Sequence, residues 1–94
     1  MEIEGNTIIF KSTPQNYYKE FHGFKPNTVR RFDDEIELAA FLYFKNRLTE
    51  CSKIKITTTF PIGDIAAQFE RYITDITKFE DLYIISWKHE DEKQ

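Results

Sequence analysis

The chain has little cysteine, glycine or proline, and it has no long apolar run. Its single cysteine, Cys51, excludes a disulfide framework and a zinc site built from cysteines. Three glycines and three prolines in 94 residues exclude collagen-like and low-complexity chains. The longest apolar run, Leu38 to Phe44, is too short to span a bilayer. Since no signal peptide is recognisable either, we expect a cytoplasmic protein that does not contact a membrane.

The chain also has no excess of basic residues, because its net charge at pH 7 is −3. This charge excludes a protein that coats nucleic acid non-specifically, since such a protein needs an excess of basic residues. One segment, residues 17–31, is nevertheless basic, with four cationic side chains against Glu20 alone: Lys19, Lys25, Arg30 and Arg31. A local basic patch on an acidic chain favours a small, specific site.

Aromatic residues are plentiful, with nine Phe, five Tyr and one Trp. Large rings at this density favour strands and broad packing faces. Hydrophobic periodicity and turn residues predict helices over residues 14–22 and 35–48. The same signals predict strands over residues 7–11, 28–32, 53–59, 65–77 and 82–87. Residues 1–94 are thus predicted to form a single α+β domain, a mixed, mostly antiparallel β-barrel of about five strands with two helices.

Several finer features follow from the same patterns. Thr13 before Pro14, and Asp34 before Glu37, are typical helix starts. The apolar phase slips between Phe69 and Tyr72, which predicts a bulge there. The second helix is so apolar that we expect packing over most of its circumference. The predicted core includes Leu38, Phe41, Leu42, Ile54, Ile56, Ile84 and Ile85.

The most informative segment is the loop between the first helix and the next strand. Gly23 can end the helix with a positive φ, and Thr28 and Arg30 share one face of the strand. With Lys25 they form a potential clamp for an anion or a polar ligand, and Phe24 can serve as a pocket wall or stacking platform. The alternative is that Lys25 and Arg30 are solvated charges and that Thr28 bonds its own backbone.

The pattern Gly23-x-Lys25-x-x-Thr28-x-Arg30 resembles the signature loop of the ASCH family, small PUA-like β-barrel domains associated with RNA and modified nucleosides. The predicted order of elements is similar, and residues 69–77 and 83–88 resemble small phage-encoded members. The resemblance implies a PUA-like (ASCH-like) barrel that recognises RNA or a modified nucleotide. Its ligand-binding residues would be Phe24, Lys25, Thr28 and Arg30.

The resemblance leaves two other functions open. In family members that hydrolyse an acylated cytidine, the motif lysine and threonine are catalytic together with a glutamate from a later helix. Lys25 and Thr28 take the first two places here, and Glu70 or Glu80 would have to supply the carboxylate. A third hypothesis is a phage-type protein that binds and inhibits a host protein through its acidic segments. For all three hypotheses we expect no metal and no cofactor, since no ligand spacing is present.

Overall fold

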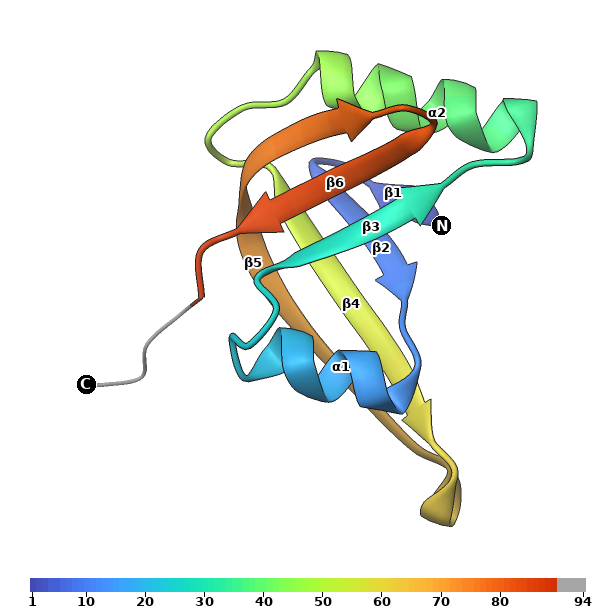
Figure 1. The fold of residues 1–94 in the computed structure, drawn as a ribbon, viewed down its shortest axis with the longest axis vertical. Helices are drawn as coiled ribbons and strands as arrows, with labels where there is room; N and C mark the ends of the chain where they lie inside the picture. The colour runs from blue at the N-terminus through green and yellow to red at the C-terminus, as the bar shows by residue number, and fades with distance from the viewer. Residues whose placement is uncertain (90–94) are drawn as a thin grey trace.

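The computed structural model describes residues 1–89 and contains a curled sheet of six strands with two helices (Figure 1). In chain order the elements are β1 (Glu2–Glu4), β2 (Thr7–Lys11), α1 (Pro14–Phe21), β3 (Asn27–Arg31), α2 (Glu35–Asn46), β4 (Lys53–Phe60), the 3-10 turn η1 (Ile62–Asp64), β5 (Ile65–Phe79) and β6 (Leu82–Trp87). Glu90, Asp91 and Glu92, which belong to the acidic segments of the third hypothesis, lie outside the described residues.

The strand order is β1-β2-β4-β5-β6-β3. All neighbours pair antiparallel except β2 and β4, which are parallel. The predicted α+β class, with a mixed and mostly antiparallel sheet and two helices, is confirmed; the sheet curls into a half-barrel. It has one strand more than expected, because the short β1 pairs with β2.

The long strand β5 produces the curl. Its first part pairs with β4 and its second part with β6, so one strand belongs to both halves of the sheet (Figure 1). The register shifts between Ile73 and Asp75. The sequence placed this bulge too early, between Phe69 and Tyr72. In the structure Phe69, Arg71 and Ile73 keep strict alternation on the buried face while Tyr72 is exposed.

The core lies on the concave face of the sheet, where both helices pack. Four of the predicted core residues are fully buried, namely Phe41, Ile54, Ile56 and Ile85, whereas Leu38, Leu42 and Ile84 are only partly buried. The remaining buried apolar side chains are Ile8, Phe10, Tyr17, Phe44, Phe69, Ile73, Ile76, Tyr83 and Trp87. Most of these residues are aromatic or β-branched, as a strand-built core requires.

Both helices begin where their capping residues predict. The Thr13 hydroxyl accepts a hydrogen bond from the Asn16 amide at 3.3 Å, and the Asp34 carboxylate accepts one from the Ile36 amide at 2.9 Å. Within residues 1–89 no helix has the length and apolar character needed to cross a membrane. The caps matter for function because Thr13 sets the start of α1, whose last turn leads into the loop with the predicted site.

Candidate ligand-binding site

The loop after α1 is held by backbone hydrogen bonds on both sides. The Lys25 amide donates to the Lys19 carbonyl at 3.1 Å, and the Pro26 carbonyl accepts from the Trp87 amide at 3.0 Å. Gly23 has φ +84°, and a Cβ at this position would lie 2.7 Å from the His89 ring. Glycine is therefore required both by the backbone conformation and by the close approach of His89.

Five polar side chains meet where this loop, the residue after β2, the last turns of α1 and strand β3 come together. We call them the Glu20 cluster: Ser12, Glu20, Lys25, Thr28 and Arg30. The structure thus brings the three predicted clamp residues together around a buried carboxylate. The Ser12 hydroxyl donates to Glu20 Oε1 at 2.8 Å. Glu20 is only 1% exposed, and Thr28 is also buried.

Arg30 is the most connected member of the cluster. Its Nε donates to Thr28 Oγ1 at 2.9 Å, its Nη1 to the Lys11 carbonyl at 3.1 Å and its Nη2 to Ser12 Oγ at 3.1 Å. The guanidinium also lies 4.6 Å from the centre of the Phe10 ring. These contacts join the edge strand β3 to the end of β2. Arg30 therefore bridges the open side of the half-barrel, and three of its five N–H groups are already used.

The carboxylate of Glu20 is held in an unusual environment. Burial raises its pKa, and this effect is opposed by the Ser12 hydrogen bond, by the charges of Lys25 and Arg30, and by hydrogen bonding to Thr28. Burial likewise lowers the pKa of Arg30, against the effect of Glu20. The charged forms of both groups are thus solvated less well in this site than in water.

Lys25 stands apart from the other members. Its Nζ lies 4.0 Å from Glu20 Oε2, which is an ion-pair distance but too long for a hydrogen bond. The Lys25 side chain is 34% exposed, compared with 1% for Glu20. Because no hydrogen bond to Glu20 has to break, Lys25 can turn its donors toward a ligand.

An aromatic patch lies next to the cluster and consists of Tyr18, His22 and Phe24. The ring centres of Tyr18 and His22 are 4.4 Å apart, and Phe24 lies 6.3 Å from Tyr18 and 6.4 Å from His22. Tyr18 is 56% exposed and Phe24 74%. Exposed rings of this kind offer flat apolar faces to solvent; the role of Phe24 as a stacking platform stays a prediction.

The sequence did not single out Glu20 as the carboxylate of the site. Two other residues, Glu70 and Glu80, were suggested instead. Glu70 is exposed on β5 and forms ion pairs with Lys53 at 3.9 Å and Lys55 at 3.4 Å, and Glu80 is exposed in the turn between β5 and β6. A signal for Glu20 was present, because it follows Tyr17 by three residues and so lies on the buried face of α1. An acidic residue on the buried face of a helix needs a partner, and here the partners come from other elements.

No group of three or more His, Cys, Asp or Glu among residues 1–89 is placed to hold a metal ion. The chemistry that this site offers is therefore that of a carboxylate, an ammonium, a guanidinium and two hydroxyls beside exposed aromatic rings.

The chain matches no model of a known protein family, and a comparison with curated proteins likewise finds no match.

Proposed function

We propose that the protein is a small ASCH-like binding module that recognises a base of RNA or of a modified nucleotide through the Glu20 cluster. One observation carries the proposal: a buried carboxylate acceptor and a partly exposed ammonium donor lie side by side, 4.0 Å apart. A nucleobase edge presents donors and acceptors in the same adjacent arrangement.

The cluster fits a base better than a phosphate. The Glu20 carboxylate repels an anion, and most of the Arg30 donors already bond within the fold. Cytosine and guanine carry an amino donor and a carbonyl acceptor, so an amino group can donate to Glu20 while a carbonyl accepts from Lys25. Thr28 acts indirectly, because its hydroxyl holds Arg30 and supports Glu20.

The aromatic patch adds a second element of base recognition. Single-stranded RNA is commonly read by stacking unpaired bases on aromatic side chains while their edges are hydrogen-bonded. Phe24 is one residue from Lys25 and, at 74% exposed, is more exposed than Tyr18 at 56%. A base stacked on this patch would have its edge near Lys25.

Binding of short fluorescent single-stranded RNAs, measured by anisotropy, tests the proposal. We expect binding to C- or G-containing RNA, and we expect Lys25→Ala to weaken it by about 10- to 100-fold, since it removes a charge-assisted hydrogen bond. Lys78→Ala is the matched control, because Lys78 is an exposed lysine on β5 outside the cluster. Equal losses in the two variants would show that binding is only general electrostatics and would contradict the proposal.

One observation supports the hydrolase as a second candidate. The raised pKa of Glu20 makes it a proton acceptor beside Lys25 and Thr28. In this role Glu20 would take a proton from water as the water oxygen bonds to the acyl carbon of an N-acylated cytidine. It would return the proton to the amino nitrogen as the C–N bond breaks. Chromatography of N4-acetylcytidine incubated with the protein tests this: turnover that Glu20→Gln and Lys25→Ala both abolish would place hydrolysis before binding.

A further inference from the structure

The outer face of α2 is apolar and exposed. Ile36 is 81% exposed and Tyr43 is 65% exposed, and Ala39 between them is exposed as well. Their spacing of three and four residues places them in one stripe along the helix. The sequence predicted that this helix packs over most of its circumference. The exposed stripe shows that this prediction is wrong for a single chain.

Charge is distributed unevenly between the two ends of the same helix. Asp33, Asp34 and Glu35 lie at its start, whereas Arg47 follows its last turn and places its guanidinium 5.1 Å from the centre of the Tyr43 ring. Two copies of α2 packed antiparallel would bring the acidic start of each against the basic end of the other. The two helix dipoles would also be antiparallel, which places the positive end of each helix beside the negative end of the other.

The stripe is self-complementary about its midpoint. A two-fold axis between Ala39 and Ala40 places Ile36 of each copy against Tyr43 of the other. The small alanines at the crossing allow the helices to approach closely. The stripe is thus matched in shape and in charge by a second copy of itself.

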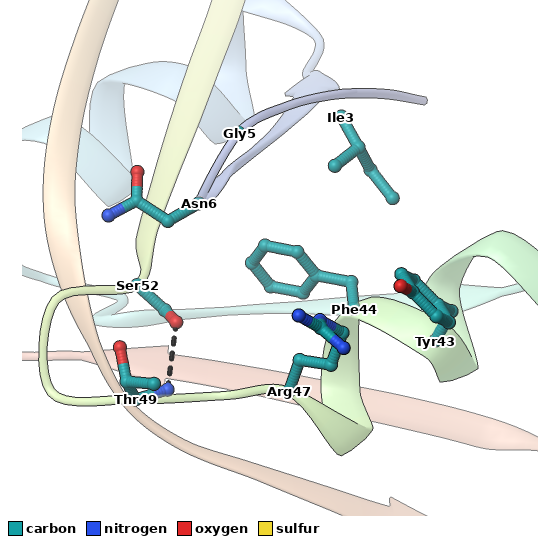
Figure 2. Close-up of a pocket in the computed structure, with 8 residues that line it drawn as sticks. All are labelled: Ile3, Gly5, Asn6, Tyr43, Phe44, Arg47, Thr49 and Ser52. Carbon is teal, nitrogen blue, oxygen red and sulfur yellow. Dashed lines mark hydrogen bonds between the residues drawn. The ribbon is translucent and has the colours of Figure 1, made fainter.

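A hollow beside Tyr43 offers room for the isoleucine (Figure 2). Its volume is about 290 Å³, and it lies between the β1–β2 turn and the C-terminal half of α2. Figure 2 shows Ile3, Phe44 and Tyr43 on its apolar side, with the Arg47 guanidinium beside the Phe44 and Tyr43 rings. In the antiparallel arrangement Ile36 of the second copy reaches this end of α2.

We propose that the protein forms a symmetric homodimer through the outer face of α2, in which Ile36 of each chain packs against Tyr43 and the neighbouring hollow of the other. This surface contains no member of the Glu20 cluster or of the aromatic patch. The inference is therefore independent of the proposed function, and either can fail without the other.

Sedimentation velocity over a wide concentration range tests the dimer. We expect a concentration-dependent dimer for the unaltered chain, and we expect Ile36→Glu to raise its dissociation constant by about 100-fold or more, because a charge replaces a buried anchor in both halves. Ile62→Glu is the matched control, since Ile62 is 86% exposed on η1. Circular dichroism verifies that both variants are folded. A monomer at every concentration, or a dimer that Ile36→Glu leaves intact, overturns the proposal.

Cysteine crosslinking tests the register. In a Cys51→Ser background, Ala39→Cys should crosslink readily on oxidation, because both copies of residue 39 lie at the two-fold axis. Ile36→Cys should crosslink poorly, since its copies are separated by about 10 Å along the helix axis at 1.5 Å per residue. Rapid crosslinking through position 36 and none through position 39 would contradict the antiparallel arrangement, even if a dimer is present.

Discussion

Replacing Arg30 by methionine should strongly destabilise the fold at neutral pH. Methionine keeps an unbranched stem against Phe10 but removes the guanidinium, and with it the hydrogen bonds to Thr28, Ser12 and the Lys11 carbonyl. The buried carboxylate of Glu20 then loses one of the two cations that oppose its desolvation. The open side of the half-barrel also loses its bridge from β3 to β2.

The size of the effect follows from these contacts. Removing one partner of a buried charge pair costs about 3 to 5 kcal/mol, and Arg30 is only partly buried, so we expect a loss of about 3 kcal/mol. At roughly 0.05 to 0.15 kcal/mol per residue, a domain of this length has a free energy of unfolding of about 5 to 14 kcal/mol. The variant should therefore still fold, but with a much smaller margin.

Urea unfolding followed by the fluorescence of Trp87, which is 3% exposed, measures this loss. The loss should shrink as the pH falls toward 4.5, the ordinary pKa of glutamate, because the raised pKa lets folded Glu20 take up its proton at a higher pH than free glutamate, and a protonated Glu20 no longer needs a cation. Glu20→Gln should reduce the loss at neutral pH in the same way. A loss below about 0.5 kcal/mol, or one that is equal at both pH values and in both backgrounds, would refute the reasoning.

Three further predictions concern the fold around the site. Because the pKa of Glu20 is raised, its protonation stabilises the fold fully below pH 4.5, and this stabilisation is lost as the pH rises through the folded-state pKa. Glu20→Gln should therefore flatten this part of the pH profile of the free energy of unfolding in urea titrations. Gly23→Ala should lower the thermal midpoint, because alanine is strained at φ +84° and its Cβ meets His89, and an unchanged midpoint would contradict the packing of His89 on the loop. Phe41→Ala, at a fully buried position, should cost about 3 to 5 kcal/mol in urea unfolding, whereas Leu42→Ala, at a partly buried one, should cost clearly less.

Local signals predicted most of the elements. Thr13 and Asp34 marked the starts of both helices, and the alternation of residues 53–59 predicted β4. β1 was missed because it has only three residues, all exposed, and thus no buried face to detect. The bulge was misplaced because Arg71 is a charged residue on the buried face, where its guanidinium lies 4.8 Å from the centre of the Phe69 ring. A pattern of polar and apolar letters cannot anticipate such a stacked arginine.

The sequence predicted only part of the site, and the reason is similar. Lys25, Thr28 and Arg30 stand close together in the sequence, so a single loop could be recognised. Ser12 and Glu20 reach the same place from the end of β2 and from α1, through contacts that only the packed structure reveals. The missing carboxylate was sought on later elements, whereas it lies five residues before the lysine.

The most direct test of base recognition is a titration of the isotopically labelled protein with cytidine, N4-acetylcytidine and a short C- and G-containing single-stranded RNA, followed by NMR. Base recognition by the Glu20 cluster predicts saturable shifts of the backbone amides of Glu20 and of residues 23–30, with the Lys25→Ala variant requiring about 10- to 100-fold more ligand. Shifts confined to other parts of the sheet, identical titrations of the two proteins, or no shifts at about 1 mM of every ligand would contradict it.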